Sequence, residues 1–204
     1  MAVPFRQETF PMNLLLLGLV LFLGAHSLRL VAPAWRERYL SKVGISTYKA
    51  IYSFVSLCGL ILLVYGYGLA RTTPVLLYAT PLWARHLALP LTWLAFVLLV
   101  ASHGPPNHLR ASLGHPMYAG VKVWAAAHLL ANGMLADLLL FGTFLIWASA
   151  GFSIRRRQDK AAGITQTPGT MRGTLGALII GTVAWVIFAL WLHRLLIGVS
   201  PLPG

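Results

Sequence analysis

Four long stretches of this sequence contain no Asp, Glu, Lys or Arg. They cover residues 9–28, 50–70, 86–109 and 173–193. A helix of about 20 apolar residues crosses the roughly 30 Å of hydrocarbon in a bilayer. The run Gly104-Pro105-Pro106-Asn107 shortens the third stretch, because two consecutive prolines cannot continue a helix. These stretches therefore predict four membrane-spanning helices.

A further apolar segment, residues 116–151, is divided by Asn132-Gly133 into two halves that are each short for a full crossing. We expect two helices joined by a tight turn there, with Pro116 in the first turn, where its missing N–H costs nothing. The sequence thus predicts an all-α fold, a polytopic transmembrane helix bundle of about six spans in a single domain over residues 1–198. The expected spans are about 10–30, 48–70, 86–102, 116–131, 135–151 and 173–197.

The basic residues indicate how these spans are oriented. The chain has 16 Lys plus Arg against 4 Asp plus Glu, and cytoplasmic loops near span ends are enriched in Lys and Arg. With six spans, the loops after the first, third and fifth spans hold twelve of the 16 bases. Both termini are therefore predicted on the non-cytoplasmic side, and residues 153–172 are expected to form a basic loop at the lipid headgroups.

The composition also limits the partners of the chain. Only 10% of its residues are charged and 58% are hydrophobic, whereas a soluble domain has about 25% charged residues. The lipid bilayer is the expected partner. Nucleic acid is excluded, although the net charge is +12, because the bases lie between apolar runs and not on a polar surface.

Seven histidines accompany only four carboxylates, and imidazole is the commonest metal and haem ligand. His26 falls in the cytoplasmic half of the first span, and His128 falls within the fourth span. Each histidine either forms a hydrogen bond between helices or has a functional role, such as binding a ligand. Two such histidines on different helices favour a shared ligand. His115 precedes Pro116 at the start of the fourth span, where it would cap the helix, bind a headgroup or act as a ligand.

The scarcity of other ligands points to haem b. A zinc or di-iron site needs carboxylates or thiolates, and the chain has one cysteine and one acidic residue within a span, Asp137. Haem needs only one or two axial imidazoles. We expect His26 and His128 to hold it, with His115 replacing His128 if the two do not reach the same depth. Arg29 would meet a haem propionate or act as a snorkelling topology charge.

Several motifs resemble the NnrU domain. They are Gly24-Ala25-His26-Ser27, His115-Pro116 through Gly120, and the run from Trp124 to Gly133 that contains Ala-His-Leu-Leu-Ala-Asn-Gly. That family comprises bacterial membrane proteins linked to denitrification and nitric oxide metabolism, together with 15-cis-zeta-carotene isomerases. The resemblance implies a bacterial inner-membrane protein that supports a nitrite or nitric oxide reductase system. In the isomerase branch it implies haem b on membrane histidines, which fall on His26 and His128.

The resemblance leaves other functions open. One is haem-dependent cis-trans isomerisation of an apolar polyene, although Ala125 stands where the isomerases offer a cysteine. Another is methyl transfer, because residues 115–120 resemble the His-Pro-x-Tyr-x-Gly signature of isoprenylcysteine and phospholipid methyltransferases, which bind S-adenosylmethionine. A cofactor-free partner of a reductase complex is a further alternative.

Overall fold

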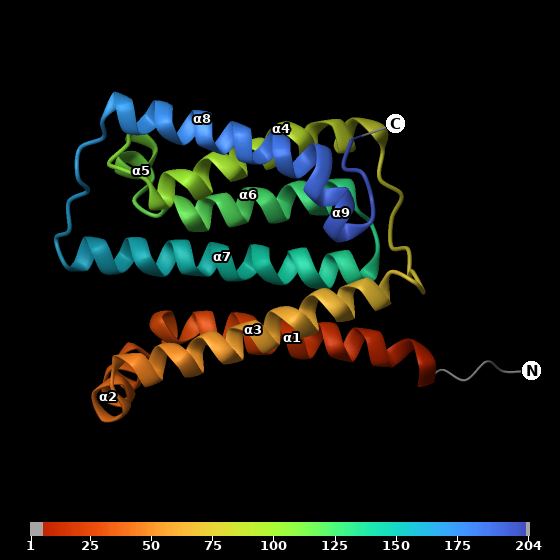
Figure 1. Cartoon of the computed structure of the whole chain (residues 1–204), viewed down its shortest axis with the longest axis horizontal. Coiled ribbons are helices and arrows are strands. Elements are labelled where there is room, and N and C mark those ends of the chain that lie inside the picture. Colours follow the sequence, from red (N-terminus) through yellow and green to blue (C-terminus); the bar gives the residue numbers. More distant parts are fainter. Residues whose placement is uncertain (1–5, 203–204) are drawn as a thin grey trace, which may run out of the picture. The chain divides into compact units, whose positions relative to one another are not determined.

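The computed structural model describes residues 6–202, with side chains from Phe10 onward. Apart from two isolated β-bridges, the regular structure of these residues is helical (Figure 1). The predicted all-α fold is therefore confirmed. The helices are α1 (Arg6–Val31), α2 (Pro33–Val43), α3 (Ile45–Ala70), α4 (Leu82–His103), α5 (His108–Leu113), α6 (Pro116–Ala131), α7 (Leu135–Ala161), α8 (Met171–Ile187), a π-helical turn (Phe188–Leu192) and α9 (His193–Ile197).

Five helical segments of the described chain are long and apolar enough to cross a membrane. They are residues 10–31, α3, α4, α7 and the continuous run from α8 to the end of α9, so the chain is a multi-pass membrane protein. The bounds of α6 coincide with the fourth predicted span, but its 16 residues extend over only about 24 Å. The sixth crossing thus stays a prediction.

The structure corrects one part of the sequence interpretation. The helix α7 continues to Ala161, ten residues beyond the predicted end of its span at 151. The expectation of a basic loop from residue 153 was therefore wrong for residues 153–161. Lys and Arg are good helix formers and are favourable near a helix C-terminus, so the basic run prolongs the helix.

The short helix α2 was not predicted. It begins at Pro33, because a proline moves the preceding residue out of the helical region, and Ala32 has φ −137° and ψ 53°. It ends at Gly44, whose φ of +79° favours glycine. In Figure 1 α2 is seen nearly end-on while α1 and α3 run across the view, so α2 lies at a steep angle to both. No residue of α2 is buried, which suits a helix in the plane of the membrane interface.

The described residues divide into two compact units. The first contains residues up to 77 together with 134–143, and the second contains 78–133 and the residues from 144 onward. The expectation of a single domain stays a prediction. In the first unit, α1 and α3 approach closely at Gly18, Gly59 and Gly66, where an added Cβ atom would overlap backbone atoms of the facing helix. Small residues permit such close packing in membranes.

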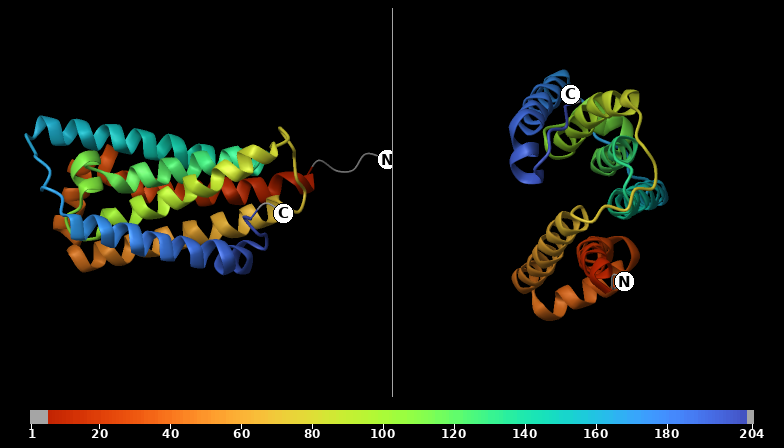
Figure 2. Two further views of the ribbon diagram at one scale, coloured as in Figure 1. Left: turned by 90° about the horizontal axis from the view of Figure 1, so that it is seen from above. Right: turned by 90° about the vertical axis from the view of Figure 1, so that its right-hand side faces the viewer.

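In the second unit, α4 packs alongside both α6 and α8 (Figures 1 and 2). Two tryptophans join α4 and α8 reciprocally. Trp93 Nε1 donates to Thr182 Oγ1 at 2.9 Å, and Trp185 Nε1 donates to Thr92 Oγ1 at 3.0 Å. On the same pair of helices, a Cβ atom at Gly181 would crowd the Val97 backbone. The α4–α8 pair is therefore fixed by specific polar contacts as well as by close packing.

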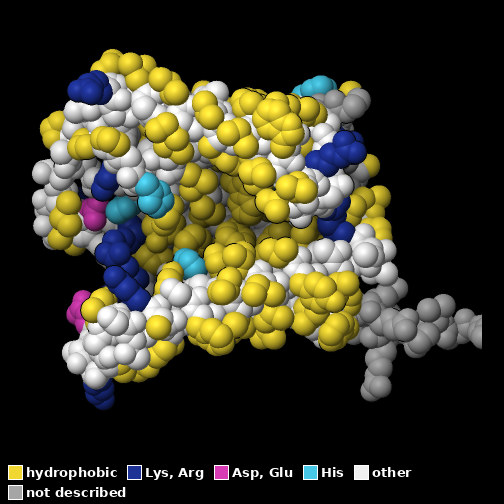
Figure 3. Space-filling model, viewed as in Figure 1, with side chains coloured by type: hydrophobic (Ala, Val, Ile, Leu, Met, Phe, Trp, Pro, Cys, Tyr) yellow, Lys and Arg dark blue, Asp and Glu magenta, His cyan; other side chains and the backbone are white. Residues whose placement is uncertain are grey.

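Many large apolar side chains are exposed along the long helices. On α8 and its continuation they include Leu175, Ile179, Val183 and Trp191, which are 49–62% exposed. In Figure 3 hydrophobic side chains cover much of the visible face, while the Lys and Arg side chains lie toward helix ends. Such a surface is unsuited to water and is typical of contact with lipid.

Candidate functional site

His26 lies on the buried face of α1. It follows Leu15, Leu19 and Phe22 at helical spacing, and the two leucines are 0% and 3% exposed. The ring centroid of His26 is 4.3 Å from that of Phe22 and 5.4 Å from that of Tyr52. Nδ1 of His26 lies 2.7 Å from the Phe22 carbonyl oxygen. Since a carbonyl only accepts, Nδ1 carries a proton in this contact.

Arg29 lies one turn further along α1 and is exposed. Because it is in the last turn of the helix, its charge is favourable there without any ligand. Both sequence interpretations of Arg29, the propionate partner and the topology charge, remain predictions.

An apolar cavity of about 360 Å³ lies between α1, α2 and α3. Gly24 and Leu28 line it from α1, and Trp35, Tyr48 and Tyr52 are among the aromatic residues around it. Gly24 and Leu28 lie about 200° around the helix from His26, given about 100° per residue. His26 itself does not line the cavity, but Tyr52 both lines it and lies beside the His26 ring.

His128 lies in the last turn of α6 and is partly buried. Its Nδ1 lies 2.8 Å from the Trp124 carbonyl oxygen, and the two ring centroids are 5.0 Å apart. The proton is thus assigned to Nδ1 as in His26. Exposed His103 makes a similar contact, since its Nδ1 lies 3.1 Å from the Leu99 oxygen, although it also lies 2.7 Å from Ser102 Oγ, so the bond alone does not mark a ligand. Partial burial beside an aromatic ring distinguishes His128 from His103.

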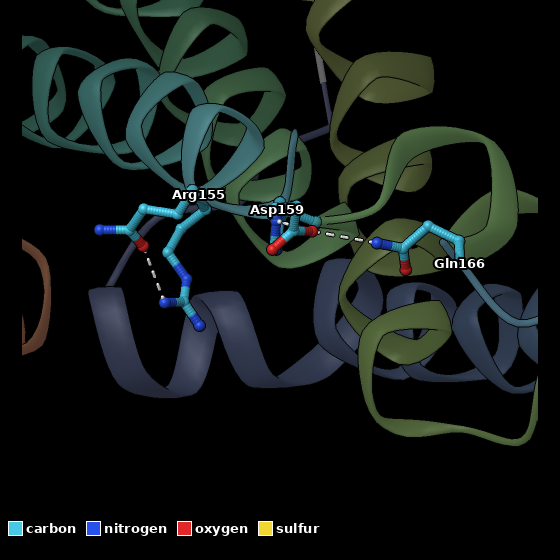
Figure 4. Close-up of polar contacts among 5 residues, drawn as sticks. Arg155, Asp159 and Gln166 are labelled. Carbon is cyan, nitrogen blue, oxygen red and sulfur yellow. Dashed lines mark hydrogen bonds and ion pairs between the residues drawn. The ribbon is translucent and has the colours of Figure 1, made fainter. Parts of the chain in front are cut away.

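His115 occupies the N-cap position of α6, but its side chain makes no capping bond. Its Nε2 lies 3.0 Å from Asp159 Oδ2 of α7, with the two side chains 17% and 20% exposed. The same oxygen accepts a hydrogen bond from Gln166 Nε2 at 3.0 Å (Figure 4). His115 and His128 stand at opposite ends of α6, about 20 Å apart along the axis, so they cannot bind one metal ion. The contact with Asp159 was not foreseen from the sequence.

Asp137, the acidic residue of the fifth predicted span, has a structural role. It is 2% exposed, and its two oxygens accept from Tyr67 Oη at 2.6 Å and from the Met134 backbone N–H at 2.9 Å. The second bond is that of a capping box at the start of α7. The sequence signal for this cap was an acidic residue placed shortly after Asn132-Gly133. Nothing in the sequence indicated that Tyr67 would bond to the same carboxylate.

Within residues 10–202, no group of three or more His, Cys, Asp or Glu side chains is arranged to hold a metal ion. A site built entirely from protein ligands needs about four such groups, whereas haem requires one or two. His26 and His128 therefore remain candidates as individual axial ligands, each held by its own helix.

The residues shared with the methyltransferase signature pack helices together. Tyr118 is 9% exposed, and its ring fills the place that a side chain at position 151 would occupy, so Gly151 is required for this contact. Its centroid is 5.3 Å from that of Trp147. A Cβ atom at Gly120 would lie 3.1 Å from the Ala95 carbonyl oxygen. Packing alone accounts for Tyr118 and Gly120.

Comparison with known proteins identifies the family of the chain. The family model described as NnrU protein matches residues 14–201. Searches of curated proteins and of solved structures gave no match. Because the matched region covers nearly the whole sequence, including His26, His115 and His128, the chain belongs to the NnrU family.

Proposed function

We propose that this membrane protein binds haem b through His26 and supports redox reactions of nitrite or nitric oxide metabolism in the bacterial inner membrane. The observation that carries the proposal is the fixed His26 ring. Its Nδ1 proton is engaged by the Phe22 carbonyl, and aromatic rings of Phe22 and Tyr52 lie beside it. A metal-binding histidine typically directs its second nitrogen to such an acceptor, which orients the ring and raises its basicity.

His128 is the second histidine that would hold the haem in this proposal. Its Nδ1 bonds to the Trp124 carbonyl in the way that His26 Nδ1 bonds to the Phe22 carbonyl. His115 is the alternative, but its Nε2 already lies 3.0 Å from Asp159, and ligating iron through that atom would break the contact. Arg29 is the proposed propionate partner at the end of α1.

When bound, haem would supply redox-active iron, for ligand binding if His26 alone held it and for electron transfer if His128 held it as well. The residues of the chain would hold and orient the imidazoles, and the apolar side chains around them would exclude water. A lower surrounding polarity tunes the potential of a bound haem. Whether His128 ligates therefore decides between ligand binding and electron transfer.

A sixth crossing by α6 forms part of the proposal, with both chain termini on the non-cytoplasmic side. The exposed carbonyls at a helix end must be satisfied if the helix stops inside hydrocarbon. At the end of α6, the single hydroxyl proton of Tyr78 lies within reach of the carbonyls of Leu129 and Asn132, and Asn132 Nδ2 donates to the His128 carbonyl at 2.9 Å. This side-chain capping supports a helix that ends below the membrane surface, which would explain why 16 residues suffice.

The visible spectrum of the full-length protein, purified in detergent from haem-replete cells, tests the haem proposal. We expect a Soret band, with sharp α and β bands on reduction, that is lost in His26→Ala. His128→Ala should convert a low-spin spectrum to a high-spin one, and His115→Ala should change neither. His103→Ala is the matched control, since His103 makes a similar Nδ1 contact at an exposed helix end. A colourless protein, or an unchanged spectrum in His26→Ala, would refute haem ligation by His26.

The same preparation separates the other functions. Conversion of a poly-cis carotene by the haem-loaded protein, absent in His26→Ala, would identify an isomerase. Binding of S-adenosylmethionine by a colourless preparation would favour a methyltransferase. If neither is seen and the colourless protein co-purifies with a nitrite or nitric oxide reductase, a cofactor-free role in that complex would replace the proposal.

A further inference from the structure

A second cavity, of about 450 Å³, lies in the second unit where α5, the end of α7 and the loop after α7 meet. Its wall includes Gly114 after α5 and Gln166 from the loop. Three basic side chains, Arg156, Arg157 and Lys160, line the cavity from α7. None of these three has a role in the proposed haem site.

The lining of this cavity carries more positive than negative charge, with three cations against one carboxylate. Asp159 is its one acidic lining residue, and Oδ2 of that carboxylate accepts from Gln166 Nε2 and lies 3.0 Å from His115 Nε2 without a hydrogen bond between them. Among the described residues, none of the three cations that line the cavity forms an ion pair within 4.0 Å. The neighbouring Arg155 donates to the neutral Gln158 Oε1 at 3.0 Å (Figure 4). The three cations that line the cavity therefore have no carboxylate partner among the described residues.

A further cation converges on the same end of α7. The Lys122 ammonium of α6 lies 5.1 Å from the centroid of the Phe152 ring, and the Arg156 guanidinium lies 5.6 Å from it. Like charges on one ring repel each other, although each is attracted to its π face. An anion beside them would relieve this repulsion. The basic residues also follow directly on the apolar part of α7, at the level where phosphate headgroups lie.

We propose that this cavity binds a phosphate-bearing anion. Arginine presents a planar fork of N–H donors that pairs with phosphate oxygens in bidentate fashion, and lysine adds a point charge. The phosphate belongs either to the headgroup of an anionic phospholipid or to a soluble phosphate compound. A purely topological role for these bases would require no cavity and would apply equally to the basic helix α2.

Calorimetric titration of the full-length protein in detergent tests the proposal with two probes. Short-chain phosphatidylglycerol represents the lipid source, with short-chain phosphatidylcholine as its zwitterionic control, and inorganic pyrophosphate represents the soluble source. We expect saturable binding of at least one anionic probe and none of phosphatidylcholine. Preference for phosphatidylglycerol assigns a lipid headgroup, and preference for pyrophosphate assigns a soluble ligand. If neither anionic probe binds, the proposal is wrong.

Matched triple variants establish the location of the site. Arg156→Gln/Arg157→Gln/Lys160→Gln should weaken binding on the order of 100-fold, given the usual contribution of each base near a membrane surface. Arg36→Gln/Arg38→Gln/Lys42→Gln removes the same charge from α2 and should change the affinity less than about threefold. Equal losses in both variants would overturn the assignment. Should the first triple variant fail to fold, Lys160→Gln alone should weaken binding about fivefold, and an unchanged affinity would refute the site.

Discussion

The bond between Tyr67 and Asp137 allows a quantitative test of the first unit. Tyr67 Oη donates to Asp137 at 2.6 Å, and the aspartate is 2% exposed. Both groups that approach the carboxyl donate to it, so it acts as an acceptor only. Removing the hydroxyl with Tyr67→Phe leaves the ring in place against Phe141, 6.2 Å away between centroids, and deletes the hydrogen bond alone.

The expected energies follow from the number of bonds lost. Hydrogen bonds to charged groups contribute about 1.5–3 kcal/mol in soluble proteins, while those between membrane helices average about 0.6 and reach about 1.7 kcal/mol. Because the bond is short and little exposed, we expect Tyr67→Phe to lower the free energy of unfolding by about 1.5 kcal/mol. Asp137→Ala also frees the Met134 N–H and should cost about 3 kcal/mol. The coupling energy of the double-mutant cycle should then be about 1.5 kcal/mol.

Unfolding of the full-length protein by SDS in mixed micelles, followed by far-UV circular dichroism, measures these energies. Tyr65→Phe is the control, because Tyr65 lies two residues earlier on α3 and is 59% exposed. Its cost should stay below about 0.5 kcal/mol. A coupling energy within about 0.3 kcal/mol of zero would contradict the assignment of this bond as a stabilising contact.

Three further predictions address packing, hydrogen bonding and charge. Gly66→Ala should destabilise the protein in the same unfolding assay by about 1–3 kcal/mol because its Cβ would overlap α1. Gly24→Ala, with open space around it, should be neutral or stabilising by up to about 1 kcal/mol, and equal costs would contradict the close approach. Trp93→Phe and Thr182→Val should each cost about 1 kcal/mol and together little more than one of them, whereas additive costs would deny their hydrogen bond. Asp159→Asn should tighten pyrophosphate binding about fivefold, and weaker binding would mean that the carboxylate orients the cations.

The helices were largely predictable from local signals. The apolar segment, with Pro116 and Asn132-Gly133 as its boundary signals, predicted α6 with its observed bounds, because such boundary residues act within one turn of chain. The end of α7 was not predicted, since the basic residues that mark the membrane boundary are also good helix formers. The number of crossings depends on how deep in the membrane α6 ends. Side-chain capping by residue 78 influences that depth, and a hydropathy pattern contains no information about such capping.

The candidate sites were less accessible from sequence. His26 and His128 were selected by their membrane position, and the structure adds the Nδ1 bonds that fix their rings. The partners Tyr67 and Asp137 are 70 residues apart, and the contact of His115 with Asp159 joins different helices. Side-chain pairing over such distances follows from helix packing, for which one sequence contains no direct signal.

The reciprocal bonds between α4 and α8 set the register of these helices. Apolar helices in lipid gain little from one alignment over another, because lipid tails are as apolar as their side chains. A slip of α8 by one turn, about 5.4 Å, would separate both indole N–H groups from their threonine oxygens at once. The two bonds thus penalise the misaligned states together. The helix α8 thereby has a single preferred position along a partner that lies some 90 residues earlier in the chain.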